Sequence, residues 1–160
     1  MNITTKIANY SNDLDKSSIE FLLDSYARDD MGGGQPLDKK VKDSVVNELA
    51  KIPHAFSVLA YSDGESVGLA NCFESFSTFM CKPIVNIHDL VVTEGYRRSG
   101  ISQLMLDKIV EIALTKGCCK VTLEVLGNNE AAKSAYSKFG FEGYRINQDT
   151  GIAQYWQKII

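Results

Sequence analysis

The chain has 160 residues, of which 44% are hydrophobic and 23% are charged, and its formal net charge is −3. This length and composition favour one soluble globular domain over residues 1–160. The slight negative charge argues against a nucleic-acid partner, and no apolar run approaches the roughly 18 residues of a membrane span. The first ten residues lack the apolar core of a signal peptide, so we expect a cytoplasmic protein that does not enter the membrane.

The cysteines and histidines give little support for a metal site. The four cysteines include no C-x-x-C pair, and the only histidines are His54 and His88. We therefore predict no bound metal. In a reducing compartment the cysteines are expected to be small buried hydrophobes, with a redox role for the adjacent Cys118 and Cys119 as the alternative.

A first strand over residues 3–8 is followed by two predicted helices. Apolar residues at helical spacing define the first helix, and its possible N-caps precede them. The caps are Ser11, Asp13 or Asp15, and the stripe is Ile19, Leu22, Leu23 and Tyr26. The second helix covers about 38–51. Three glycines at 32–34 separate the helices, because they cannot continue one. This loop is either a flexible connector or a lid over a binding site.

The middle of the chain reads as a hairpin followed by a central strand. Strands over 56–61 and 65–73 are joined by Ser62-Asp63-Gly64, a strong turn signal. The aromatic tract 74–82 reads as a strand end plus a loop. Its phenylalanines are expected in the core or an interface, or else in the wall of a binding pocket. A buried strand over 84–92 comes next.

The rest of the chain alternates between helices and strands. Gly117 and Gly140 are suitable C-terminal caps for the two helices. The predicted elements are a helix over 101–116, a strand over 120–125, a helix over 129–139, a strand that begins at Phe141, a turn at 149–151 and a last strand over 153–159.

The segment 87–103 joins a buried strand to the first turn of a helix. Such a junction aims backbone N–H groups and the positive end of the helix dipole at one point. Arg97 and Arg98 flank this point, and Gly100 allows a ligand to approach the backbone. The pattern predicts a phosphate or pyrophosphate site, and the alternative is an ordinary turn with two surface arginines.

Two segments resemble the GNAT acyltransferase superfamily. Residues 97–102, R-R-S-G-I-S, are similar to its acyl-CoA-binding signature, with Ser102 in place of the usual glycine or alanine. A second set of residues falls in the register of the family, namely Asn129, Ala132, Tyr136, Gly140 and Phe141. The resemblance implies an α/β GNAT acyl-CoA N-acyltransferase fold, with a central mixed, mostly antiparallel sheet and helices on both faces.

The resemblance also implies acetyl-CoA as the cofactor. Its amide-rich pantetheine arm would pair with the central strand like an added strand, and its pyrophosphate would lie at the loop before the helix. The implied cofactor-binding residues are Leu90, Val91, Val92, Arg97, Arg98, Ser99, Gly100, Ile101, Ser102, Gln103, Asn129, Ala132 and Tyr136.

Acetyl transfer to an amine requires a base and an acid. A primary alkylamine resembles lysine, with a pKa of about 10.4, so it is mostly charged at neutral pH and must lose a proton. The resemblance implies Tyr136 as the general acid for the departing thiolate. His88 is the preferred base, Asp89 is the second candidate, and a water chain ending at Glu74 or a backbone carbonyl is the third. Because strand neighbours point to opposite faces, His88 and Asp89 can share a pocket only at a bulge.

We therefore expect an acetyl-CoA-dependent N-acetyltransferase. The resemblance, loosely to the diamine and small-amine branch, implies a small-molecule primary amine as the acceptor and a homodimer as the assembly. It makes Asp29, Asp30 and Glu74 candidate acceptor-binding residues. The alternatives are an enzyme that modifies proteins or peptides and a CoA-binding regulator without catalysis.

Overall fold

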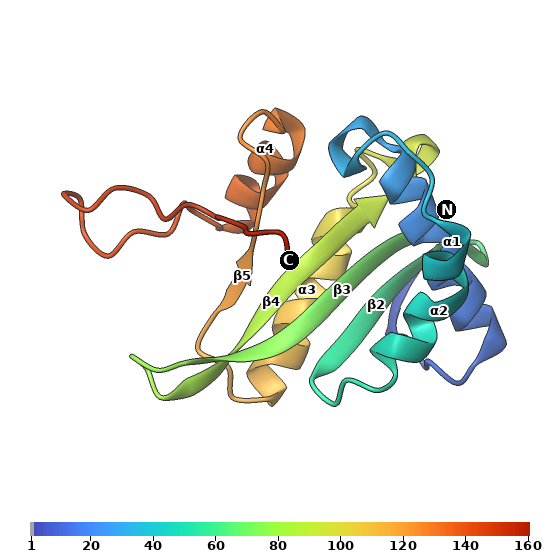
Figure 1. Cartoon of the computed structure of the whole chain (residues 1–160), viewed down its shortest axis with the longest axis horizontal. Helices are drawn as coiled ribbons and strands as arrows, with labels where there is room; N and C mark the ends of the chain where they lie inside the picture. The colour runs from blue at the N-terminus through green and yellow to red at the C-terminus, as the bar shows by residue number, and fades with distance from the viewer. Residues whose placement is uncertain (1) are drawn as a thin grey trace. The chain divides into compact units, whose positions relative to one another are not determined.

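The computed structural model describes residues 2–160 and divides them into two compact units (Figure 1). The larger unit extends to Leu123, and the smaller one runs from Glu124 to Ile160. The prediction of a single domain over residues 1–160 stays a prediction. Among the residues described, no helix has the length and apolar character that crossing a bilayer requires.

A five-stranded sheet forms the centre of the larger unit. Its strands are β1 (Ile3–Ile7), β2 (Ala55–Ser62), β3 (Glu65–Ser77), β4 (Lys82–Val92) and β5 (Val121–Leu123). They lie in the order β1-β2-β3-β4-β5 (Figure 1). The first four strands pair antiparallel, and β5 pairs parallel to β4. This arrangement confirms the predicted mixed, mostly antiparallel sheet.

Helices cover both faces of this sheet. They are α1 (Asp13–Arg28), α2 (Lys39–Leu49) and α3 (Ile101–Thr115), with short 3-10 turns η1 (Asp30–Gly32) and η2 (Glu94–Tyr96). Leu69 of β3 packs with residues of α1 and α2 in one buried cluster. A Cβ atom on the preceding residue, Gly68, would lie 2.7 Å from the sulfur of Met105 in α3. Because strand neighbours point to opposite faces, α3 covers the face that α1 and α2 do not.

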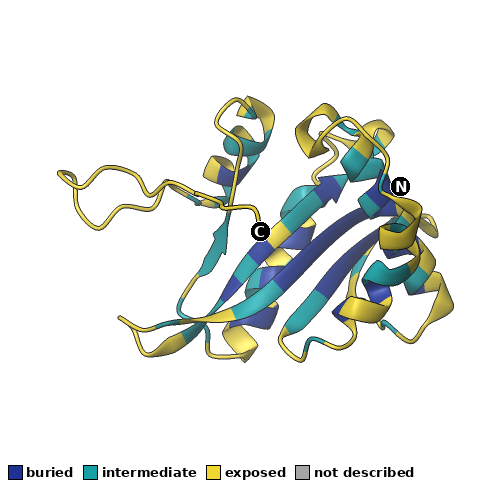
Figure 2. Ribbon diagram, in the orientation of Figure 1, coloured by how far each residue is buried: buried dark blue, intermediate teal, exposed yellow. Residues whose placement is uncertain are grey.

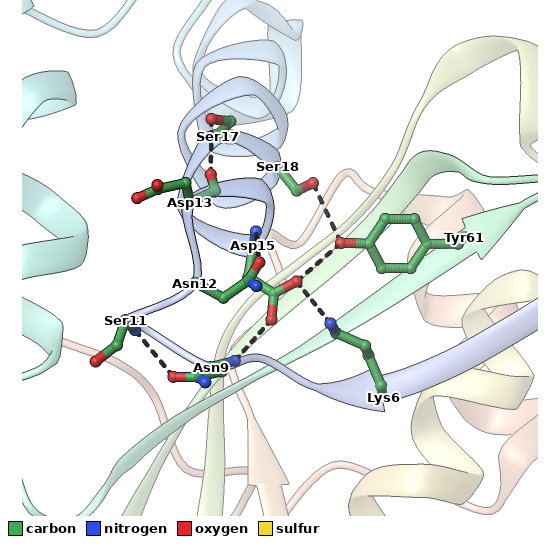
Figure 3. Close-up of polar contacts among 9 residues, drawn as sticks. All are labelled: Lys6, Asn9, Ser11, Asn12, Asp13, Asp15, Ser17, Ser18 and Tyr61. Atoms are coloured by element: carbon green, nitrogen blue, oxygen red, sulfur yellow. Dashed lines mark hydrogen bonds and ion pairs between the residues drawn. The ribbon is translucent and has the colours of Figure 1, made fainter.

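The N-terminus of α1 is built around a buried carboxylate (Figure 3). Asn12, absent from the predicted caps, is the N-cap and accepts the Asp15 N–H at 3.0 Å. Because Asn12 is three residues before Asp15, its side chain can accept the Asp15 N–H. Asp15 is therefore a residue of the helix and not its cap. The Asp15 side chain is fully buried and accepts from Lys6 Nζ at 2.7 Å, from the Asn9 N–H at 2.8 Å and from the Tyr61 hydroxyl at 3.2 Å.

The β2–β3 connection has the predicted tight turn. Asp63 and Gly64 both have positive φ, 50° and 93°, as the two-residue turn of a hairpin requires. The aromatic tract consists of a strand end and a loop, as predicted, because β3 continues to Ser77 and β4 begins at Lys82. Phe76 and Phe79 are largely exposed, so the expectation of a place in the core is wrong for them.

The expectation that the cysteines are buried holds for Cys72 and is wrong for Cys81, which is exposed.

The smaller unit contains α4 (Glu130–Phe139), whose predicted ends are confirmed. Asn129 is its N-cap, and Gly140 ends it in the left-handed conformation at φ 108°. The strands predicted from Phe141 and over 153–159 are wrong, since no described residue from 141 to 160 is in a strand. Alternating apolar residues allow a strand but do not supply a pairing partner, and this segment is almost entirely exposed (Figure 2).

Candidate active site

A β-bulge interrupts β4 at the two candidate bases. Asn71 of β3 pairs with Asp89, and the next residue, Cys72, pairs with Ile87. His88 is therefore the extra residue of β4, with no counterpart in β3. A bulge of this kind changes the direction of side chains along the strand.

The bulge places His88 and Asp89 on the same face of the sheet. Asn71 and Phe73 are two positions apart in β3, so their side chains share a face. Asn71 Nδ2 donates to Asp89 Oδ2 at 2.9 Å, and the rings of Phe73 and His88 meet edge to face, with centroids 5.8 Å apart. Both candidate bases therefore point to the side that Asn71 and Phe73 occupy.

This shared face is the one that α1 and α2 cover. Val91 of β4, two positions after Asp89, belongs to the buried cluster that contains Ile19 and Leu22 of α1. Tyr26, near the C-terminal end of α1, also borders the site. Burial raises the pKa of the Tyr26 phenol, and the nearby charges of Asp89 and Asp29 raise it further. Asp89 thus lies close to the end of α1.

Arg97 connects the segment after β4 to the segment after α1. Its Nη2 donates to Asp29 Oδ2 at 2.6 Å, and its Nε donates to the carbonyl of Val92 at 3.2 Å. The Arg97 guanidinium and the N–H of Met31 hold the pKa of Asp29 below its ordinary value. The ion pair brings together two residues with separate predicted roles, pyrophosphate binding for Arg97 and acceptor binding for Asp29.

The other candidate acceptor-binding residues lie apart from this ion pair. Asp30 is exposed and begins η1. Glu74 pairs with Lys116, just beyond α3, and two observations place it on the opposite face from the candidate bases. It follows Phe73 directly in β3, and its partner extends from the helix that covers the other face. The structure does not bring Glu74 together with His88 and Asp89.

The loop before α3 has the geometry of an anion site. Gly100 occupies the N-cap position with φ 86°, and no side chain caps the helix there. A Cβ atom on Gly100 would have no neighbour within 4 Å, so the space in front of the residue is open. Helix geometry leaves the first N–H groups of α3 without intrahelical partners. Arg98 and Ser99 beside them are exposed, so these residues fit a pyrophosphate group.

The open edge of β4 leads to this loop. On the side of β5, the strand pairs only at Val85, Asn86 and Ile87 among the described residues. Leu90, Val91 and Val92 lie beyond this pairing and continue toward η2. An extended, amide-rich group fits beside this stretch as an added strand.

The smaller unit carries the remaining candidates on α4. Tyr136 is 9% exposed, and its ring packs edge to face on Phe141 with centroids 5.9 Å apart. Asn129 Oδ1 accepts the N–H of Ala132 at 3.1 Å. The Asn129 side chain therefore caps α4, a role that the sequence analysis did not assign to it.

Three polar residues near Asp89 were not identified from the sequence alone. They are Tyr10, Ser57 and Asn71, which form a hydrogen-bonded chain on the sheet. The available signal was a polar residue at the centre of an apolar strand run, with Asn71 inside V-G-L-A-N-C-F and Ser57 inside A-F-S-V-L-A. Buried polar side chains in such positions need specific partners.

Comparison with known proteins decides the family. Residues 19–141, more than half of the chain, match the model of the Acetyltransferase (GNAT) family. The chain belongs to the GNAT family. This result confirms the resemblance drawn from residues 97–102 and 129–141, and the architecture agrees with it.

Among its relatives, an uncharacterized N-acetyltransferase, YhfO, of Bacillus subtilis (strain 168) is 29% identical over 61% of this chain and 62% of its own. Thialysine N-epsilon-acetyltransferase of Bos taurus is 35% identical over 46% of this chain and 43% of its own. This GNAT chain thus matches less than two thirds of the length of either relative. The fold is also similar to a solved structure, AAC(6')-Iy in complex with the bisubstrate analog CoA-S-monomethyl-acetylneamine. The alignment covers all of both chains, with a TM-score of 0.75 and 17% identity, and it supports the fold.

Proposed function

We propose that this GNAT protein transfers an acetyl group from acetyl-CoA to a primary amine of a small molecule. The bulge in β4 carries the proposal, because it turns His88 and Asp89 to one face of the sheet. In the chain, the two residues come shortly before the loop that fits a pyrophosphate. The strand thus offers polar groups for an amine and leads directly to a site for a nucleotide.

The cofactor site is proposed along β4 and the start of α3. The open edge at Leu90, Val91 and Val92 would pair with pantetheine, and residues 97–103 would hold the pyrophosphate. In the smaller unit, Asn129, Ala132 and Tyr136 complete the set by family resemblance. Acetyl-CoA supplies the activated acyl group, and the chain's residues position the acceptor and move protons.

His88 and Tyr136 are the proposed base and acid. An exposed imidazole at the bulge is accessible to a charged amine and can remove its proton. Tyr136 would protonate the sulfur as the thiolate leaves. The charged amine loses two protons: the first goes to His88 before the attack, and the second leaves the nitrogen as the carbon–sulfur bond breaks and replaces the proton that Tyr136 gives to sulfur. A new carbon–nitrogen bond stands in place of the carbon–sulfur bond, and the net proton released is the one on His88.

Replacing His88 with glutamine tests the base. We expect His88→Gln to lower kcat by about 100-fold, because general base catalysis contributes at least this much, and to remove the acidic limb of the pH–rate profile. His54→Gln is the matched control, because His54 is also exposed and its ring also lies near Phe73, at 6.4 Å. A His88→Gln profile that keeps the wild-type acidic limb would remove His88 from this role.

The acceptor class is tested by thiol release from acetyl-CoA with a panel of amines. The panel contains polyamines, arylalkylamines, aminoglycosides and peptides with free amino termini. Turnover of small amines is expected. Turnover of peptides alone would instead establish a protein-modifying enzyme, and CoA binding without any turnover would establish a regulator. A cytoplasmic location and a homodimer stay predictions.

A further inference from the structure

Asp89 lacks the basic partner that most other covered carboxylates have. Asp15, Asp24, Asp29 and Glu74 each pair with a lysine or arginine. Asp89 is half-buried, and none of the ion pairs within residues 2–160 includes it. A carboxylate removed from water stays ionised only when hydrogen bonds or a cation compensate the lost hydration.

A chain of buried hydrogen bonds ends on Asp89. The Tyr10 hydroxyl lies 2.9 Å from Ser57 Oγ, and Ser57 Oγ lies 2.7 Å from Asn71 Oδ1. Asn71 Nδ2 then lies 2.9 Å from Asp89 Oδ2. Ser57 is fully buried and Asn71 is 3% exposed, so water competes little with these bonds.

The chemistry of the groups fixes the direction of this chain. The Asn71 amide must turn its nitrogen toward the carboxylate, since two acceptor oxygens would repel each other. Its oxygen therefore faces Ser57, which must donate, and Tyr10 must donate to Ser57. Burial raises the pKa of the Tyr10 phenol, which agrees with a protonated donor. An amide does not pass protons on, so the chain orients Asp89 and does not relay protons to it.

Asp89 Oδ1 is the oxygen that Asn71 leaves available. No described residue donates a hydrogen bond to it. Tyr26 on α1, Cys72 on β3 and the adjacent His88 on β4 are ionisable groups near Asp89, and burial raises the pKa of both Tyr26 and Cys72. The phenol and the thiol are therefore neutral near pH 7, and none of the three is a permanent cation.

We propose that Asn71 is a positioning residue, locked by Ser57 and Tyr10, which presents Asp89 as an ionised anchor for the ammonium group of the acceptor. The inference rests on the proposed function and adds to it that the acceptor enters as a cation. Asp89 receives the charged amine, and the adjacent His88 takes its proton. The ammonium group of the substrate thus provides the positive charge that pairs with Asp89.

Steady-state kinetics with a small alkylamine test the positioning role. We expect Asn71→Leu to raise KM for the amine by about tenfold or more, because a hydrogen bond to the charged anchor is lost. The change in kcat should be less than threefold, and KM for acetyl-CoA should not change. Ser57→Ala removes only the group that orients Asn71, so it should raise KM in the same direction by a smaller factor. An unchanged KM in both variants, or a loss confined to kcat, would overturn the proposal.

Glu20→Gln provides a matched control. Glu20 on α1 is also half-buried and also lacks a lysine or arginine partner, but among the described residues no side chain donates a hydrogen bond to it. If Asn71 and Asp89 form a specific anchor, Glu20→Gln keeps the wild-type KM. An equal rise of KM in Glu20→Gln would show that only the general negative charge matters, and it would reject the anchor.

A binding measurement separates this proposal from the proposed function. The Asn71 side-chain amide signals in a ¹⁵N–¹H spectrum are assigned by their loss in Asn71→Leu. They should shift when n-butylamine, 1,3-diaminopropane or phenethylamine is added, and they should not shift in Asp89→Asn. A shift without turnover supports the anchor and rejects the enzyme. Turnover with no shift for any turned-over probe amine rejects the anchor alone.

Discussion

Tyr136→Phe should lower kcat by about 10²–10⁴-fold, the range that a general acid contributes. The reason is that phenylalanine cannot protonate the departing thiolate, while its ring keeps the packing. Tyr136 is 9% exposed and meets Phe141 edge to face, so the substitution preserves the contact that holds the ring. We expect the affinity for CoA, measured by calorimetry, to change less than threefold.

Tyr155→Phe is the control for this prediction. Tyr155 belongs to the same unit and is 74% exposed, so loss of its hydroxyl should leave kcat unchanged. A single-turnover measurement must accompany steady-state kinetics, because slow product release can hide a change in the chemical step. Equal single-turnover rates for Tyr136→Phe and the wild type would exclude Tyr136 as the acid.

Asp15→Asn should lower the free energy of unfolding by about 2–4 kcal/mol. The carboxylate is fully buried between β1 and α1, and it accepts three hydrogen bonds from Lys6, Asn9 and Tyr61 (Figure 3). An amide has the same shape but only one acceptor oxygen, so at least one donor would face an NH₂ group. For a chain of this size the melting temperature should fall by roughly 5–12 °C, as calorimetry can measure.

The pH dependence of stability gives the second part of this test. Burial by itself would raise the pKa of Asp15, but the bonds from Lys6, Asn9 and Tyr61 outweigh it and hold the pKa below its ordinary value. The contribution of Asp15 is therefore complete above its unfolded-state pKa of about 3.9 and is lost as the pH falls through the lower folded-state pKa. The gap between wild type and Asp15→Asn should narrow below pH 4.

An exposed aspartate in the same helix turn serves as the reference for these values. Asp13 is exposed, so Asp13→Asn should change stability by less than about 0.5 kcal/mol. If Asp13→Asn and Asp15→Asn destabilise equally, a general effect of charge near the helix N-terminus explains the loss, and the buried network does not.

Most elements of the larger unit follow from local signals in the sequence. Apolar spacing predicted α1, α2 and α3, and Asp63-Gly64 predicted the β2–β3 hairpin, because these elements depend on nearby residues. The strands expected after Phe141 failed for a different reason. Their alternation is a local property, but a ladder of hydrogen bonds requires a partner strand that the sequence pattern does not specify.

The candidate site was predictable where it consists of one short segment. Residues 97–103 carry their own turn, glycine and helix start, so their role as an anion site could be proposed from the sequence. The Asn71–Asp89 bond and the Arg97–Asp29 ion pair could not be proposed in this way, because each joins residues from different elements. Whether His88 and Asp89 share a face depended on a bulge, which changes strand pairing and leaves no distinctive residue in the sequence.

The bulge in β4 also limits which length changes this protein can tolerate. Ile87 and Asp89 pair with the adjacent residues Cys72 and Asn71, so they already face opposite sides of the sheet, and deletion of His88 would restore a regular ladder without turning their side chains. A one-residue deletion elsewhere in β4 would reverse the facing of one side of the break relative to the other. A deletion at the bulge is therefore less damaging to the strand than a deletion elsewhere in β4, although it removes the proposed base. Among homologues, we expect changes in the length of this strand to fall at the position of His88 and not elsewhere between Ile87 and the Arg97 loop.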